Sequence, residues 1–169
     1  DLSGPKIRMQ PNETPLATFR ALGANPLALD IKELYSALEQ GVVDGQENPY
    51  AIILANRFSE VQKYVSNTGH FFDFILVVAN RRQFQGMRPA DQKTLRAAMG
   101  AAVEHQRQLA VALDGKALEE LKKKMRYDEL SPQARDELRK ASAGVVDTVK
   151  RRVDPALVDR VIAEVAQAR

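Results

Sequence analysis

The feature that most restricts how this chain folds is a nearly continuous apolar stretch at residues 71–79, which we call the apolar segment. Aromatic and β-branched side chains fill it, a composition typical of a strand, and Asp73 is its one charged residue. A strand that is apolar on both faces is expected to be covered on both sides. The segment is too short to cross a bilayer, which takes about 20 apolar residues. We therefore expect a sheet protein in which this strand has neighbours on each side.

The residues before the apolar segment alternate between short strands and helices. Residues 6–10 and 25–29 are predicted strands, and residues 31–40 are a predicted amphipathic helix that ends before Gly41. A further helix is expected to begin at a Thr14 N-cap and to stop at Gly23. Strand, helix and strand in this order predict parallel strands. The spacing of apolar residues also predicts a mostly helical region over residues 50–64.

From Pro89 onward the pattern is that of long helices. Apolar residues recur at spacings of three and four as far as Met125, across Gly100 and Gly115. Ser131 is expected to cap a helix that continues to about residue 152, and Asp154 is expected to cap the last one. The 169 residues therefore predict one connected unit, rich in strands and helices in its first half and helical in its second.

Composition gives little support to several classes of function. The chain has no cysteine, which excludes thiolate metal sites and disulfides, and its net charge of +3 does not indicate nucleic-acid binding. The basic residues at 122–124 follow Glu119 and Glu120, as on a mixed-charge helix face. Its two histidines belong to no catalytic motif. We expect no catalytic residue, no metal and no cofactor.

Two polar residues are candidates for binding a small ligand. Arg8 lies in the strand between two prolines, and its planar guanidinium can hold a carboxylate through two hydrogen bonds. Asn48 lies in the turn before Pro49 and offers both donors and an acceptor. Taken alone, the pattern favours a solvated strand residue for Arg8 and a turn former for Asn48 over ligand binding.

A set of sequence motifs identifies a family. The motifs are KIR at 6–8, LGANP at 22–26, ELYSALEQGVVDGQENP at 33–49, EVQKY at 60–64 and TGH at 68–70. In wording, order and spacing they resemble the solute-binding proteins of TRAP transporters, the DctP family. The long motif at 33–49 is specific, and the resemblance covers residues 1 to about 80, with a helical remainder that fits in length and pattern.

The resemblance implies a periplasmic receptor without a reaction of its own. Such a receptor captures an organic acid, a dicarboxylate or another carboxylate, and delivers it to a membrane permease. It implies that Arg8 forms a salt bridge with the ligand carboxylate and that Asn48 hydrogen-bonds the ligand. Asn12, His70 and Asp73 are implied as weaker ligand-binding candidates.

The resemblance also implies how the chain is divided. The expected fold is the second lobe of a type II periplasmic-binding-protein-like α/β protein: residues 1–70 in the lobe, 71–80 in a crossing strand, and 88–169 in a long helix and the carboxy-terminal helices. The first lobe is expected to be largely absent, as in a carboxy-terminal portion of a longer protein. We therefore expect the chain either to self-associate through the exposed crossing strand or to bind its ligand weakly.

Two other functions are compatible with parts of this pattern. The helical region from Pro89 could serve a non-catalytic protein-interaction module, in which the first half is only a scaffold. An enzyme acting on a small carboxylate ranks third, because no motif activates a nucleophile or a proton transfer. The arginine strand and the turn that holds Asn48 favour the receptor, since an interaction module needs neither.

Overall fold

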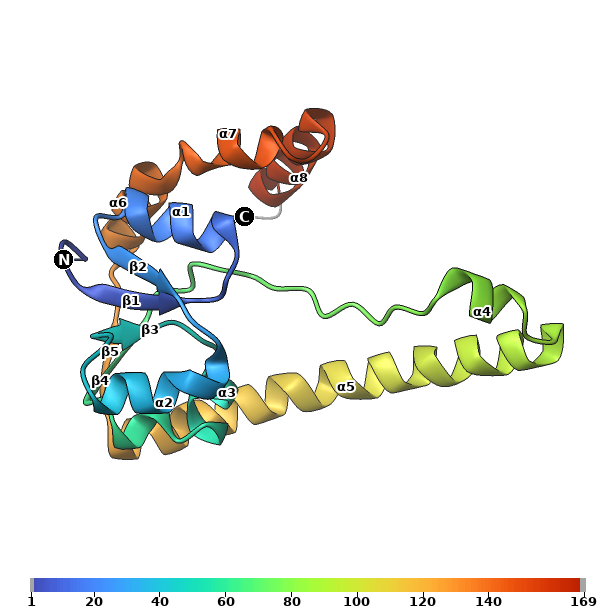
Figure 1. Cartoon of the computed structure of the whole chain (residues 1–169), viewed down its shortest axis with the longest axis horizontal. Coiled ribbons are helices and arrows are strands. Elements are labelled where there is room, and N and C mark those ends of the chain that lie inside the picture. The colour runs from blue at the N-terminus through green and yellow to red at the C-terminus, as the bar shows by residue number, and fades with distance from the viewer. Residues whose placement is uncertain (1, 168–169) are drawn as a thin grey trace.

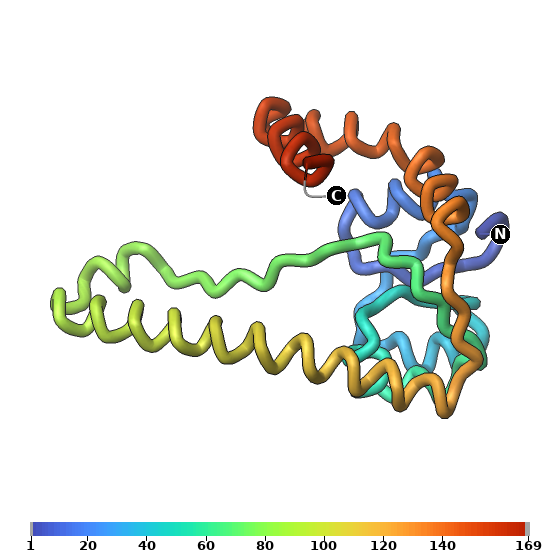
Figure 2. The backbone as a smooth tube through the Cα atoms, turned by 180° about the vertical axis from the view of Figure 1, so that it is seen from behind, coloured from blue at the N-terminus to red at the C-terminus, as the bar shows by residue number. Residues whose placement is uncertain are grey.

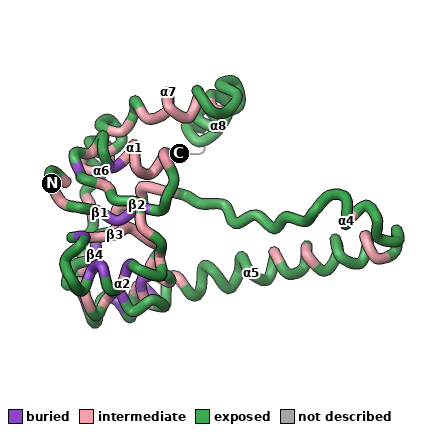
Figure 3. The backbone as a smooth tube through the Cα atoms, in the orientation of Figure 1, coloured by how far each residue is buried: buried purple, intermediate pink, exposed green. Residues whose placement is uncertain are grey.

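The computed structural model describes residues 2–167, which form an α/β body and a long projecting arm (Figure 1). The arm consists of residues 71–113. An extended segment runs outward from the body, the chain turns through a short helix, and it returns as the first part of a long helix (Figure 2). Nearly all buried residues lie in the body, and the arm is almost entirely exposed (Figure 3).

The first sheet of the body is parallel and has the strand order β2-β1-β3. Lys6 pairs with Asn25, and Arg8 pairs with Leu27 on one side and Gln46 on the other. The elements of this half are β1 (Lys6–Met9), α1 (Glu13–Ala21), β2 (Asn25–Ala28), α2 (Ile31–Glu39) and β3 (Gly45–Gln46). The predicted parallel pair and both predicted helices are confirmed, within one or two residues at their ends.

The start of α1 differs from the prediction. Asn12, not Thr14, is the N-cap, and its side chain accepts a hydrogen bond from the backbone N–H of Thr14 at 3.0 Å. The sequence offers both residue types within three positions, and the helix begins at the earlier one. The next helix begins as expected: Asp30 accepts from the backbone N–H of Lys32 at 2.9 Å, and Gly41, at φ +70°, follows its end.

The second sheet was not predicted. It is a parallel pair of β4 (Tyr64–Asn67) and β5 (Arg126–Glu129), in which Tyr64 lies opposite Arg126. The helix expected over residues 50–64 is shorter, and ends in a separate helical turn: α3 (Tyr50–Ala55) and η1 (Phe58–Glu60). Arg57 separates these two with a left-handed backbone, φ 60°. A left-handed residue cannot continue an α-helix, so the apolar pattern here does not produce one helix.

The apolar segment is the clearest disagreement with the sequence. Residues 71–80 are extended but take part in neither of the sheets among residues 2–167. Phe72, Ile75 and Val78 are 83%, 85% and 84% exposed. A buried strand pairs with neighbouring strands and is covered by packed layers on both faces. The body supplies neither strand neighbours nor covering layers along the arm.

Helices follow: the helical pattern predicted from Pro89 onward is confirmed, and the short helix at 81–85 was not predicted. They are α4 (Arg81–Gln85), α5 (Pro89–Lys124), α6 (Pro132–Ser142), α7 (Val145–Lys150) and α8 (Pro155–Gln167). Helix α5 runs unbroken for 36 residues. Ser131 caps α6 as expected, by accepting from the backbone N–H of Ala134 at 3.1 Å. The single helix expected from 131 to 152 is instead two, which are separated next to Gly144.

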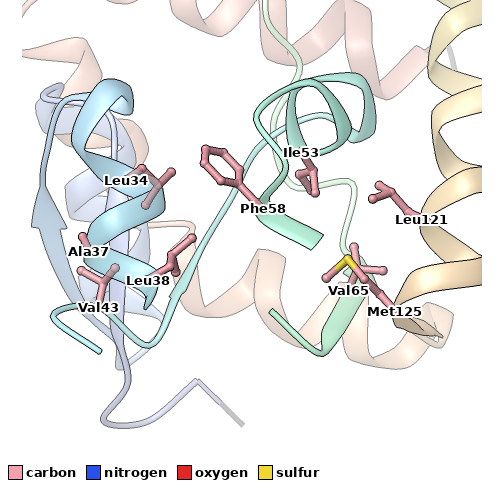
Figure 4. Close-up of a cluster of buried hydrophobic side chains, with 9 residues drawn as sticks. All are labelled: Leu34, Ala37, Leu38, Val43, Ile53, Phe58, Val65, Leu121 and Met125. Carbon is pink, nitrogen blue, oxygen red and sulfur yellow. The ribbon is translucent and has the colours of Figure 1, made fainter. Parts of the chain in front are cut away.

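Two apolar clusters form the core of the body. The larger one unites α2, α3, β4 and the end of α5, and is made up of Leu34, Ala37, Leu38, Val43, Ile53, Phe58, Val65, Leu121 and Met125 (Figure 4). The smaller one lies between the first sheet and α1 and consists of Met9, Phe19 and Ala24. The carboxy-terminal end of α5 is thus anchored in the core, whereas its amino-terminal part extends into the arm.

Candidate carboxylate-binding site

Two of the candidate ligand residues, Arg8 and Asn48, lie toward the carboxyl end of the first parallel sheet. Arg8 is the third residue of β1, and Asn48 follows β3 by two positions. Because Arg8 is in register with Gln46, the Asn48 turn starts beside the arginine strand. The carboxyl edge of a parallel sheet is where open α/β folds bind their ligands.

Arg8 is a buried cation with unused hydrogen-bonding capacity. Its residue is 2% exposed, and its Nε donates to the carbonyl oxygen of Leu29 at 2.8 Å. One of its two terminal guanidinium nitrogens, Nη1, is buried and has no hydrogen-bond partner among residues 2–167. Burial lowers the pKa of Arg8 from its ordinary value, and the nearby carboxylates of Glu47 and Asp30 act in the opposite direction. The solvated strand arginine is therefore excluded.

Asn48 projects from a turn whose geometry is held by its neighbours. Its side-chain amide donates to Gln46 Oε1 at 2.6 Å, and Pro49 then leads into α3. The start of α3 is fastened to α5, because the backbone N–H of Ala51 donates to Asp114 Oδ1 at 3.2 Å. Asn48 lines a cavity of about 510 Å³ between the two sheets. Arg8 is not part of the wall of this cavity, and lies one strand away from Gln46 in the first sheet.

His70 lines the same cavity and pairs with a carboxylate. Its Nε2 lies 3.5 Å from Glu47 Oε2, with 20% of the His70 side chain and 15% of the Glu47 side chain exposed. Its Nδ1 lies 2.6 Å from the hydroxyl of Thr68, and its ring packs against Phe19 and Phe71 with centroids 5.3 and 4.4 Å away. Glu47 thus lies near both His70 and the Arg8 cation.

Glu47 was missed as a candidate, although it stands in the motif at 33–49. Its place in the site follows from its contact with His70, which lies 23 positions later in the sequence, and no local spacing indicates such a contact. The two remaining candidates are placed elsewhere. The Asn12 side chain serves as the cap of α1, and Asp73 belongs to the exposed arm, outside the cavity that Asn48 and His70 line.

Metal sites and membrane spans were searched within the described part of the chain. Residues 2–167 contain no group of three or more His, Asp or Glu side chains placed to hold a metal ion. Over the same residues, no helix combines the length and apolar character that crossing a bilayer requires.

Comparison with known proteins places these features in a family. The family model described as bacterial extracellular solute-binding protein, family 7 (DctP) matches residues 1–152. The C4-dicarboxylate-binding periplasmic protein DctP of Rhodobacter capsulatus is 31% identical over 170 residues, which cover 99% of this chain and 51% of that protein. The 2,3-diketo-L-gulonate-binding periplasmic protein YiaO of Escherichia coli K12 is 34% identical over 147 residues, 80% of this chain and 45% of that protein.

A solved structure extends the similarity to the whole fold. A TRAP periplasmic solute-binding protein from Ralstonia eutropha H16, crystallised with bound (S)-2-acetolactate, superposes with a TM-score of 0.91 at 31% identity. The match covers 99% of this chain and 55% of that one. This chain therefore spans about half the length of the proteins it matches, and its fold corresponds to one lobe of theirs together with the arm and the carboxy-terminal helices.

Proposed function

This chain belongs to the DctP family of bacterial extracellular solute-binding proteins, and on that premise we propose that it provides one side of an organic-acid binding site. In this proposal Arg8 pairs with a ligand carboxylate in the periplasm, and the loaded protein delivers the acid to a TRAP-type membrane permease. Residues 1–70 act as the lobe, 71–80 as the crossing segment and 88–169 as its helical support. The family consists of solute-binding proteins, not enzymes.

The observation that carries the proposal is the unpaired nitrogen of Arg8. A buried guanidinium loses its hydration, and a donor left without a partner is unfavourable by about 1–3 kcal/mol. A ligand carboxylate would supply the missing acceptor and a compensating charge. Two similar proteins support this choice of ligand, since one is named for C4-dicarboxylates and the other holds the carboxylate acetolactate.

Asn48 and His70 are proposed to orient the bound acid. Both face the cavity between the sheets, and Asn48 can turn its amide from Gln46 toward a ligand. The Thr68 hydroxyl and the rings of Phe19 and Phe71 hold the His70 ring, so it offers a fixed wall. Asn12 and Asp73 stay outer candidates in this proposal: Asn12 follows the carboxyl end of β1, and Asp73 lies in the first residues of the arm.

The test is a titration of this chain with succinate, a C4-dicarboxylate, followed by nuclear magnetic resonance. We expect the Nε–H signal of Arg8 and the side-chain amide signal of Asn48 to shift in a saturable way. Replacing Arg8 by Lys removes the planar fork but keeps the charge, and should weaken binding roughly thirtyfold or more, the equivalent of about 2 kcal/mol.

Arg20→Met is the matched control, because Arg20 is an exposed arginine paired with Glu13 on α1. It should leave the titration unchanged. Binding of succinate by Arg8→Lys as tightly as by the unaltered chain would contradict the proposal.

A further inference from the structure

The turn that carries Asn48 is held at one end by the first sheet. It begins at Gln46, which is in register with Arg8, and the Asn48 amide donates back to Gln46 Oε1 at 2.6 Å. Pro49 follows with φ −58°, and a residue before proline is restricted to extended backbone, so Asn48 has little conformational freedom of its own. The direction of its side chain therefore depends on what holds the other end of the turn, at the start of α3.

The start of α3 has no cap of its own. The first N–H groups of an α-helix lack partners within the helix, and a side chain at the N-cap normally accepts a hydrogen bond from one of them. Here the N-cap is Pro49, whose side chain makes no capping hydrogen bond. Its carbonyl oxygen accepts from the backbone N–H groups of Ile52 and Ile53. The N–H of Ala51 bonds outside the helix.

Asp114 of α5 supplies the missing cap. Its Oδ1 accepts from the Ala51 N–H at 3.2 Å, across 63 positions of sequence. Residues three and four apart on a helix share a face, so Asp114 lies on the same face of α5 as the buried Ala117 and Leu121. That face packs on the body, where a carboxylate without a hydrogen-bond donor is unfavourable. The Ala51 N–H is such a donor.

Apolar packing surrounds this hydrogen bond. Tyr50, the first residue of α3, packs on the larger core cluster, to which Ile53 of α3 and Leu121 of α5 also belong. Burial raises the pKa of the Tyr50 hydroxyl, and the nearby Asp114 carboxylate adds to this effect. Apolar contacts hold the two helices together without fixing a direction, whereas a hydrogen bond is directional. The Asp114 carboxylate therefore defines how the first turn of α3 is oriented.

From these contacts we propose that Asp114 is a positioning residue of the acid-binding site. Asp114 does not contact the ligand in this proposal. It fixes the start of α3, and together with Gln46 at the other end of the turn it holds the Asn48 amide toward the cavity. The inference rests on the proposed function, in which Asn48 orients the bound acid. It adds that the long helix, and not the motif at 33–49 alone, sets the orientation of Asn48.

Succinate titrations of the full 169-residue chain, followed by nuclear magnetic resonance, test this role. Asp114→Ala removes the acceptor and should weaken binding about fivefold, the equivalent of one ordinary hydrogen bond. The side-chain amide signal of Asn48 should respond less, while the Nε–H signal of Arg8 still shifts to saturation. Asp114→Asn keeps an acceptor oxygen and should retain most of the affinity.

Ser131→Ala is the matched control. Ser131 also caps a helix through one side-chain hydrogen bond, from the Ala134 N–H at 3.1 Å, and it lies outside the cavity that Asn48 lines. Its substitution should cost a similar amount of stability and leave the titration unchanged.

The ligand-free chain provides a second measurement. Asp114→Ala should speed hydrogen exchange of the Ala51 amide and increase the mobility of the Asn48 side-chain amide in relaxation measurements, whereas Ser131→Ala should change neither.

Three results would overturn the inference: an unchanged affinity in Asp114→Ala, an equal loss of binding in Ser131→Ala, or an Asn48 side chain that stays as ordered in ligand-free Asp114→Ala as in the unaltered chain. Failure of the unaltered chain to bind succinate would instead refute the proposed function. The ligand-free measurement would then still decide whether Asp114 holds the Asn48 turn.

Discussion

The two sheets of the body differ in how they are held. In the sheet β2-β1-β3, consecutive strands are joined by one helix each, and the arginine strand is covered so fully that Arg8 and Met9 are 2% and 0% exposed. In the sheet β4-β5, partners 62 positions apart meet, and most of their side chains are exposed. The first sheet is thus a product of local sequence, whereas the second depends on α5 returning from the arm. Packing at the end of α5 should therefore govern the second sheet most strongly.

The largest effect is expected from Leu121→Ala. Leu121 is 0% exposed and belongs to the larger core cluster, through which α5 holds β4 and β5. Removing its side chain leaves a cavity, and the free energy of unfolding should fall by about 2–5 kcal/mol. Urea denaturation measures this loss. Leu113→Ala, at a position that is 55% exposed on the same helix, should change it by far less.

If both Leu variants lost equal stability, the anchoring of the second sheet by α5 would be refuted. If Leu121→Ala also abolished the amide protection of β1 in hydrogen exchange, the two sheets would form one cooperative unit instead of two differently held parts.

A smaller effect is expected at the start of α1, within the locally specified sheet. Asn12→Ala removes the side chain that caps this helix and should reduce the free energy of unfolding by about 1 kcal/mol. Thr14→Ala should have little effect, because Thr14 contributes its backbone N–H and not its side chain to the cap. Thermal unfolding of the two variants decides between the two capping residues, and a larger loss for Thr14→Ala would reverse the assignment.

The smallest effect is expected at the carboxyl end of the second sheet. The side chains of Tyr127, Asn67 and Arg135 contact the Glu129 carboxylate and hold its pKa below the ordinary value of 4.5. A carboxyl group whose pKa is lower in the folded state stabilises the fold above the unfolded-state pKa, and this contribution is lost as the pH falls through the folded-state value.

Glu129→Gln should therefore lower the melting temperature slightly at pH 7 and by less at pH 3, because the contribution of the ionised carboxylate is lost as the pH falls through the lowered folded-state pKa. Melting curves at the two pH values provide the comparison. An equal reduction at both pH values would assign the contribution of Glu129 to packing and not to its charge.

The limits of prediction follow the same division between the sheets. Strand β1 and helices α1 and α2 have their neighbours nearby in sequence, so alternation, caps and Gly41 suffice to predict them. Strand β5 follows a long helix and is polar, with a partner 62 positions away, so its pattern did not indicate a strand. Membership of the family was predicted from the motif at 33–49, and the family comparison confirmed it.

The site shows the same contrast. Arg8 could be proposed as a site residue from its strand and the motif around it, because the relevant residues lie close in sequence. The contact between Glu47 and His70 could not, because it depends on how the turn after β3 packs against the loop after β4. The apolar segment was predicted to be a covered strand, yet it joins neither sheet of residues 2–167 and its side chains are exposed.

Because α5 is long, a small rotation at its anchored end moves its far end over a large distance. The helix first bonds to the body at Asp114, and the 25 helical rises between Pro89 and that point span about 38 Å. Turning the helix by about 10° at this fulcrum displaces its far end by roughly 7 Å over that length. A displacement of about 2 Å at Leu121, seven helical rises beyond the fulcrum, is thereby converted into a movement that is larger than the spacing between two strands.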